Sequence, residues 1–167
     1  MKRLTLSLLV LGLLAGCAGQ ETKPTAPVEE KKPEVTTGQV QPTPVAVDPL
    51  HDPNNILSKR SIYFDFDKYD IKDEFKPIVE AHARYLNEHR DANVIVQGNA
   101  DERGSREYNL ALGQRRAEAV KKMMNVLGVG DGQIETVSFG EEKPKAECHD
   151  ESCWSQNRRD DIVYKGE

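Results

Sequence analysis

Short stretches of the chain alternate hydrophobic and polar residues or form brief apolar runs, as β-strands do. In residues 61–66 (SIYFDF), Ile62, Phe64 and Phe66 alternate with their neighbours, which predicts a strand with one buried face. Residues 92–98 (ANVIVQG) form a nearly continuous apolar run that fits a central strand. Two further strands are predicted at residues 133–140 (QIETVSFG) and 160–165 (DIVYKG).

Two longer segments repeat apolar residues at helical spacing. Residues 72–90 are predicted to form a helix, in which Pro77 is tolerated because it falls near the first turn. A second helix is expected from about residue 105 to residue 127, where a glycine ends the pattern. A helical turn is expected around residues 154–159. The order βαβαβ(α)β predicts the α+β class, a two-layer sandwich with helices on one face of a mixed sheet.

One arginine of the second helix lies where an apolar residue is expected. The predicted buried stripe of this helix consists of Leu112, Ala119, Val120, Met123 and Leu127. Arg116 falls in the middle of that stripe, about 40° around the helix from Leu112. Asn109 shares the same face, whereas Arg115 points outward. Because a guanidinium stays charged and is costly to bury unpaired, Arg116 is expected to reach a cleft that contains an anion.

The N-terminus has the layout of a secretory signal. Lys2 and Arg3 precede an apolar run over residues 4–14, and small residues follow. The run is too short to span a bilayer permanently. The sequence LAGC at residues 14–17 resembles the bacterial lipobox, in which the cysteine becomes the lipidated first residue of the mature protein.

This resemblance implies that residues 1–16 form a lipoprotein signal peptide and that Cys17 carries the lipid. A plain signal peptide cut near Ala15, with Cys17 incidental, is the alternative, because the small-residue cleavage rule does not require a cysteine. By the same resemblance, Ala18 at the second mature position, where aspartate would favour the inner membrane, points to the outer membrane.

Composition changes sharply along the mature chain. Seven of the nine prolines lie between residues 24 and 53, whereas all ten aromatic residues lie between residues 63 and 164. Residues 17–57 are therefore expected to form a lipidated N-terminus and a disordered, proline-rich tether that spans between about 35 Å and about 120 Å. Residues 58–167 are expected to form one compact domain.

Charge and missing motifs exclude two classes of function. Loss of Lys2 and Arg3 reduces the 23 basic residues to 21 against 28 acidic ones, a formal charge of −7. Such a chain is no candidate for general nucleic-acid binding. The sequence has no Ser-His-Asp spacing, no framed Cys and His pair and no phosphate-cradling glycine loop, so neither an enzyme nor a cofactor is expected.

Five motifs occur in the order typical of the outer-membrane protein A-like (OmpA-like) domain family. They are YFDFDKYDI at 63–71, GNADERGSREYN at 98–109, LGQRRAEAV at 112–120, SFGEEKP at 138–144 and NRRD at 157–160. The family signature is matched by Asn109, Leu112, Gly113, Arg116, Ala117 and Val120. Asn99 and Ala100 depart from the usual pattern, while Asp101 keeps its place. With its lipobox and tether, the whole chain resembles the lipoprotein branch of this family, which acts in the Tol–Pal envelope system.

The resemblance implies a ligand with both signs of charge: the free end of diaminopimelate in a peptidoglycan stem peptide. Arg116 would bind its carboxylate and Asp101 its ammonium, since a guanidinium matches a carboxylate bidentately and an aspartate accepts hydrogen bonds from an ammonium. The other expected ligand-binding residues are Asn109 on the helix and Phe66, Asp67 and Tyr69 in the loop after the first strand. The alternative is a structural salt bridge between Asp101 and Arg116.

Four carboxylates at the end of the first predicted strand and just after it suggest calcium. They are Asp65, Asp67, Asp70 and Asp73. Because this segment lacks the glycine and the bidentate glutamate of an EF-hand loop, a solvated strand end is expected instead, and no metal.

The segment CHDESC offers two sulfurs and a histidine. Cys148, His149 and Cys153 are a candidate metal site, yet two cysteines this close in an exported protein are expected to form a disulfide. His82 and His89 are expected to be exposed on the first predicted helix.

Two functional interpretations remain open. In the first, a non-catalytic module in the periplasm tethers the outer membrane to the cell wall, with lipid at one end and peptidoglycan at the other. This module would act in cell division and outer-membrane integrity. In the second, an adaptor of the same fold has a vestigial cleft and binds mainly the periplasmic Tol β-propeller protein, other Tol components or another envelope protein. Co-sedimentation with isolated cell-wall sacculi distinguishes them.

Overall fold

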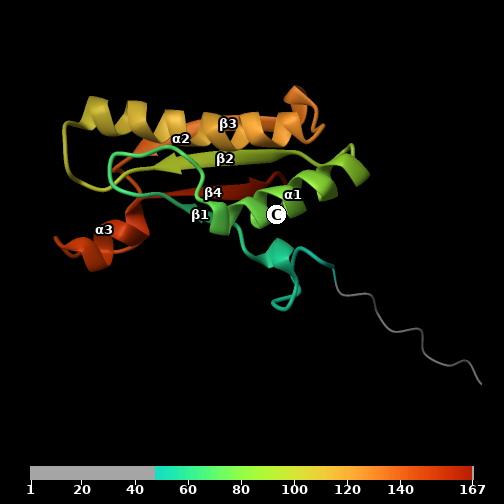
Figure 1. The fold of residues 1–167 in the computed structure, drawn as a ribbon, viewed down its shortest axis with the longest axis horizontal. Coiled ribbons are helices and arrows are strands. Elements are labelled where there is room, and N and C mark those ends of the chain that lie inside the picture. The colour runs from blue at the N-terminus through green and yellow to red at the C-terminus, as the bar shows by residue number, and fades with distance from the viewer. Residues whose placement is uncertain (1–47, 167) are drawn as a thin grey trace, which may run out of the picture. The chain divides into compact units, whose positions relative to one another are not determined.

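The computed structural model describes residues 48–166 and shows helices packed on a mixed four-stranded sheet (Figure 1). The strands are β1 (Ser61–Tyr63), β2 (Val94–Asn99), β3 (Ile134–Gly140) and β4 (Arg159–Tyr164). The helices are α1 (Lys76–Glu88), α2 (Arg106–Val126) and α3 (Glu151–Asn157), with short 3-10 turns at Ile56–Ser58, Asp73–Phe75 and Asp131–Gln133. The predicted α+β class and element order are confirmed.

The strand order is β1-β4-β2-β3, in which β2 and β3 are parallel and β4 is antiparallel to both β1 and β2. Helices α1 and α2 contact each other and share one apolar core with the sheet. Alternate residues of the central strands, such as Val94 and Val96 in β2, point into that core. Figure 1 shows α3 at one end of the sheet, near the loop that follows β1 and the loop that precedes α2.

The first strand is shorter than its alternation predicts. It ends at Tyr63, and although Phe64 is buried, Phe66 is 54% exposed, so its expected burial is wrong. The chain leaves the sheet here because Lys68 donates a backbone hydrogen bond to Asp65, which closes a turn. The turn contains Asp67 in the left-handed region, at φ 55°. A side chain in such a turn does not follow the two-residue period of a strand.

The buried face of α2 is rotated relative to the predicted stripe. Arg116 and Val120 are buried as expected, but Leu127 is 40% exposed because the helix ends at Val126. The complete buried set is Asn109, Leu112, Gly113, Arg116, Ala117, Val120 and Met124. This rotation follows from close contact of α2 with β2, since a Cβ on Gly98 would collide with the backbone of Gly113.

The first helix buries one of the two histidines that were expected to be exposed. His89 is exposed, whereas His82 is buried, with Nδ1 2.8 Å from the Tyr164 hydroxyl and Nε2 3.0 Å from the carbonyl oxygen of Lys59. Burial lowers the pKa of His82, which favours the neutral ring. The expectation for His82 is wrong because two hydrogen bonds satisfy the ring inside the core.

The described chain begins before the expected domain boundary at residue 58. Leu50 and Leu57 are buried in the apolar core, so residues 48–57 pack on the domain rather than belonging wholly to a tether. The predicted signal peptide, the lipidation site Cys17 and the rest of the tether lie outside the described residues. Within residues 48–166, no helix combines the length and the apolar character needed to cross a membrane.

Candidate functional site

A cleft of about 210 Å³ opens where the loop after β1, the turn before α2 and the first turns of α2 meet. Its lining residues are Phe66, Asp67, Asp101, Arg103, Gly104, Tyr108, Asn109, Leu112, Arg116 and Arg158. Five of the six expected ligand-binding residues are in this set. The exception is Tyr69, which lines a separate, open groove together with Arg115 and Met123 of α2.

Arg116 extends from α2 toward the floor of the cleft and is fully buried. Its Nε donates to the carbonyl oxygen of Lys68 at 2.8 Å and its Nη1 to that of Asn99 at 2.7 Å. Its Nη2 donates to the carbonyl oxygen of Asp65 at 3.2 Å, and the guanidinium lies over the Phe64 ring. Burial lowers the pKa of Arg116 to about 10, so the side chain stays charged at neutral pH. Carbonyl dipoles therefore accept hydrogen bonds from this cation and fasten the loop after β1 to α2.

Asp101 is also buried, and two arginines hold it. Its Oδ1 accepts from the backbone N–H and Nε of Arg103, and its Oδ2 accepts from Arg103 Nη2 at 2.7 Å and Arg158 Nη1 at 3.1 Å. Burial alone would raise the pKa of Asp101, but these hydrogen bonds outweigh it and hold the pKa below its ordinary value. Within residues 48–166, Asp101 makes no ion pair with Arg116, so the alternative of a structural salt bridge between them is wrong.

The turn between β2 and α2 is built by local hydrogen bonds. Asp101 accepts a hydrogen bond from the N–H of Arg103. Gly104, the next residue, adopts φ 112°, a conformation that glycine tolerates best. Ser105 then caps α2 by accepting a hydrogen bond from the N–H of Tyr108. The side-chain hydroxyl of Tyr108 donates to Asp67 across the cleft, and this bond raises the Tyr108 pKa.

Sequence reasoning missed Arg103, Tyr108 and Arg158 as lining residues. Arg103 follows two residues after Asp101, and Arg158 belongs to the NRRD motif. The roles of Arg103 and Arg158 depend on the contact between the turn before α2 and the end of α3, two segments that are far apart in the sequence. No period within either segment indicates that contact.

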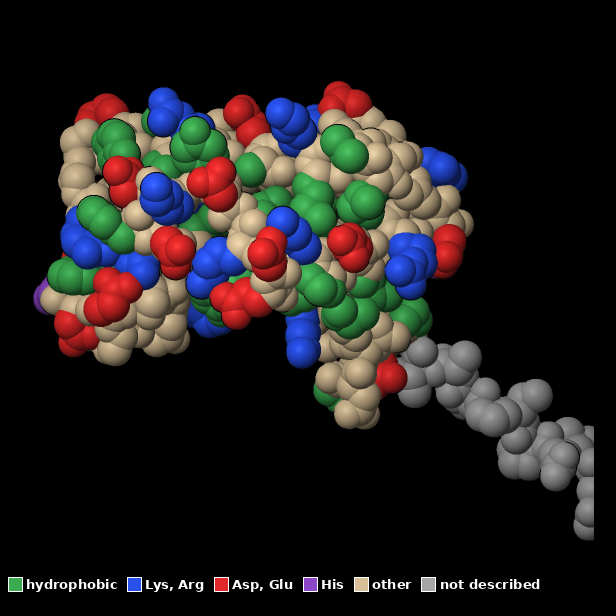
Figure 2. Space-filling view, viewed as in Figure 1, with side chains coloured by type: hydrophobic (Ala, Val, Ile, Leu, Met, Phe, Trp, Pro, Cys, Tyr) green, Lys and Arg blue, Asp and Glu red, His purple; other side chains and the backbone are tan. Residues whose placement is uncertain are grey.

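The cleft carries charges of both signs. Arg103, Arg116 and Arg158 provide three positive charges, and Asp67 and Asp101 provide two negative ones. Because Arg103 and Arg158 already pair with Asp101, the arrangement suits a ligand that carries both a cationic and an anionic group. Elsewhere on the surface, acidic and basic side chains are interspersed over the face shown in Figure 2, without one large basic patch of the kind that nucleic acid requires.

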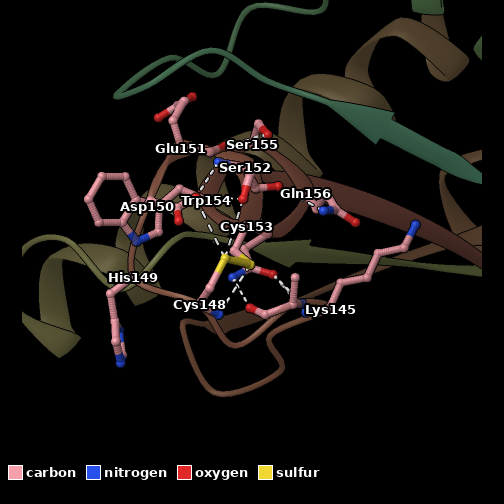
Figure 3. Close-up of a disulfide and its surroundings, with 12 residues drawn as sticks. Lys145, Cys148, His149, Asp150, Glu151, Ser152, Cys153, Trp154, Ser155 and Gln156 are labelled. Atoms are coloured by element: carbon pink, nitrogen blue, oxygen red, sulfur yellow. Dashed lines mark hydrogen bonds between the residues drawn. A yellow bond between two sulfur atoms is a disulfide. The ribbon is translucent and has the colours of Figure 1, made fainter.

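The cysteines after β3 form a disulfide, Cys148–Cys153, with Cα atoms 5.5 Å apart (Figure 3). The predicted disulfide is confirmed over the metal-site alternative. In the part of the chain that the structure describes, no three His, Cys, Asp or Glu side chains are placed to hold a metal ion.

Comparison with known proteins identifies the family. Residues 63–158 match the OmpA family. The peptidoglycan-associated lipoprotein of Haemophilus influenzae is 55% identical over 104 residues, which cover 62% of this chain and 68% of that protein. The corresponding protein of Pasteurella multocida is 53% identical over 104 residues, covering 62% and 69%. The crystal structure of the peptidoglycan-associated lipoprotein from Burkholderia pseudomallei is 57% identical, with a TM-score of 0.69, and covers 71% of this chain and 100% of that one. The chain therefore belongs to the OmpA family.

Proposed function

We propose that this protein is an outer-membrane lipoprotein that binds peptidoglycan non-covalently, through the free end of diaminopimelate in the stem peptide. The main support is the cleft, where three arginines and two aspartates surround a space of about 210 Å³. Such a site complements a head group with an ammonium and a carboxylate on one carbon. The name of the similar lipoproteins describes association with peptidoglycan and so supports peptidoglycan as the polymer that is bound.

Arg116 is the proposed partner of the ligand carboxylate. Each terminal guanidinium nitrogen carries two protons, and the bonds to Asn99 and Asp65 use one on each. One proton on each terminal nitrogen therefore remains for the ligand. The three carbonyl bonds also orient the guanidinium before binding, which reduces the side-chain entropy lost on association.

Asp101 and Asp67 are the proposed partners of the ligand ammonium. Asp101 already pairs with Arg103 and Arg158, and these two arginines occupy part of its hydrogen-bond acceptor capacity. Asp67 is exposed and, among the residues described, has no ion pair, although it accepts a hydrogen bond from Tyr108. The ammonium is expected to lie between the two carboxylates, with Asn109 and Phe66 completing the walls.

The wider role in our proposal is mechanical. Lipid on Cys17 holds the protein at the outer membrane, residues between Cys17 and the domain bridge the gap, and the domain binds the cell wall from the periplasm. We place this activity in the Tol–Pal system, where the β-propeller protein and other Tol components are the protein partners. The protein acts by binding and not as an enzyme.

Co-sedimentation of the purified full-length protein with isolated sacculi tests the proposal. The sharpest variant is Asp67→Asn, because this exposed side chain is not part of the core and its loss should leave the fold intact. One lost charge-assisted hydrogen bond is worth about 1.5 kcal/mol or more, so binding should weaken by about tenfold. Arg115→Ala, an exposed arginine beside Arg116 on α2, is the matched control and should bind normally.

The ligand provides an independent arm of the same test. Amidation of the free carboxylate of diaminopimelate should weaken binding to the wild-type protein, because the carboxylate then no longer pairs with Arg116. If folded Asp67→Asn and Asp101→Asn proteins co-sediment like the wild type, and amidation changes nothing, the assigned site is wrong.

A further inference from the structure

Side chains of α3 contact the turn that carries Asp101. The guanidinium of Arg103 contacts two aromatic rings, with its central carbon 4.0 Å from the centre of the Phe66 ring and 4.2 Å from that of Trp154. Phe66 and Arg103 line the cleft, whereas Trp154 belongs to α3 and does not line it. Because Arg103 also pairs with Asp101, the position of Trp154 affects the positions of both charged side chains in the cleft.

Polar contacts fasten the same two segments together. The indole Nε1 of Trp154 donates to Glu102 at 2.8 Å, and His149 Nδ1 lies 2.8 Å from the same carboxylate. Glu151 pairs with Arg158 and lies 3.6 Å from Arg103. Side chains from α3 and from its entry loop thus contact residues 101–103.

The helix that makes these contacts is too short to be stable alone. It has seven residues, fewer than an isolated helix needs in water. Asp150 caps it by accepting a hydrogen bond from the N–H of Ser152. The cystine adds a covalent tie, since it joins the exposed Cys148 of the entry loop to the buried Cys153, and the Cys148 N–H donates to the Cys153 sulfur at 3.1 Å (Figure 3).

We propose that the Cys148–Cys153 disulfide and Trp154 are positioning elements of the ligand cleft. The disulfide fixes α3, and contact with Trp154 in turn fixes Arg103 and its partner Asp101. Ligand affinity then depends on the redox state of a disulfide that lines no part of the cleft. This inference rests on the proposed function, because affinity for peptidoglycan is its readout.

Titration of the full-length protein in detergent with a disaccharide tripeptide from peptidoglycan tests the inference. Dithiothreitol reduces the disulfide to two thiols, giving two electrons and two protons and closing its own cyclic disulfide. We expect the reduced protein and the Cys148→Ser/Cys153→Ser variant to bind about fivefold more weakly than the oxidised wild type. Circular dichroism should show that the rest of the domain remains folded.

Trp154 is the single tryptophan of the chain, so tryptophan fluorescence reports on the surroundings of this one ring. Reduction should shift its emission to longer wavelength as the ring loses its place against Arg103. A role limited to global stability would leave both the emission and the affinity of the folded protein unchanged. Gln156→Ala, on the exposed side of α3, is the matched control and should alter neither.

Variants with the disulfide intact separate positioning from folding. Trp154→Phe keeps a ring for Arg103 but loses the hydrogen bond to Glu102, whereas Trp154→Ala loses both. Affinity should fall in the order wild type, Phe, Ala, and reduction should add little to Trp154→Ala. Wild-type affinity in Trp154→Ala overturns the inference, even if the double serine variant does not fold. Failure of the oxidised wild type to bind the fragment refutes the proposed function instead.

Discussion

Two buried aspartates, Asp101 in the cleft and Asp160 in β4, show how differently one side chain is accommodated in two regions of the same domain. Asp101 accepts hydrogen bonds from two arginines, which hold its pKa below the ordinary value against the effect of burial. Asp160 is fully buried, and neither of its carboxylate oxygens has a hydrogen-bond partner among residues 48–166. Burial raises its pKa well above the ordinary value.

Under the proposed function, the difference is between a charged carboxylate that is kept for ligand binding and a buried carboxyl whose charge the fold disfavours. At the cleft, hydrogen bonds from Arg103 and Arg158 stabilise the ionised carboxylate of Asp101, which lines the cleft. In the sheet interior, the carboxyl is desolvated and favours its neutral form, although the field of Arg116 opposes this. Removing each aspartate should therefore change stability in opposite directions.

The largest expected effect is that of Asp101→Ala. This substitution removes one partner of the buried guanidinium of Arg158 and one partner of Arg103, and breaking a buried pair on one side costs about 3 kcal/mol or more. Urea denaturation followed by circular dichroism measures the loss. An unchanged unfolding midpoint would show that Asp101 is not a structural anchor, and the comparison with Asp160 would fail.

The opposite sign is expected for Asp160→Val. A β-branched apolar residue suits β4 and removes two buried oxygens that have no hydrogen-bond partner in the described part of the chain, so stability at neutral pH should rise by about 1 to 3 kcal/mol. The same urea titration measures it. Ile162→Val, a neighbouring core change in β4, is the control and should destabilise slightly. Destabilisation by Asp160→Val would mean that the carboxylate is stabilised after all.

Sequence periodicity predicted the elements of this fold because most core positions are apolar. It also placed Arg116 in the buried face of α2, since one helical turn separates it from Leu112 and Val120. The acceptors of Arg116 were not predictable, because they are backbone carbonyls of the loop after β1 and of the end of β2, which only the packed fold brings close to α2.

The remaining differences have the same origin. His82 is polar by composition, yet contacts with Tyr164 and Lys59 make a buried site for it. The left-handed turn at Asp67 exposes Phe66 and carries Tyr69 away from the cleft, and residue type alone does not indicate that turn. Pairwise contacts across the fold, rather than local pattern, decide each of these positions.

The pH dependence of stability should distinguish the two aspartates. The folded-state pKa of Asp160 is raised, so its contribution to stability is fully present below the unfolded pKa of about 3.9 and is lost as pH rises through the folded pKa. The folded-state pKa of Asp101 is lowered, so its contribution is present above the unfolded value and is lost as pH falls.

Urea titrations of wild type and Asp160→Val between about pH 4 and pH 7 measure how the stability difference between the two proteins changes with pH. The stability gained by Asp160→Val should be smallest near pH 4 and should grow as pH rises, because only the wild type must keep Asp160 protonated or bury its charge. A constant difference across this range would indicate that Asp160 titrates normally.

The smallest effect is expected from an exposed ion pair beside the cleft. Arg106 Nε lies 2.8 Å from a carboxylate oxygen of Glu142, but the two side chains are 73% and 51% exposed. Water and salt screen such a pair, and ordering two long side chains offsets most of the Coulombic gain. A double-mutant cycle with Arg106→Ala and Glu142→Ala should therefore give a coupling of at most about 0.5 kcal/mol, falling further at high salt. The distance is shorter than the 3.1 Å between Arg158 and Asp101, so a small coupling here would show that burial, rather than separation, sets the strength of the pair in the cleft. A coupling comparable to the effect of Asp101→Ala would contradict that conclusion.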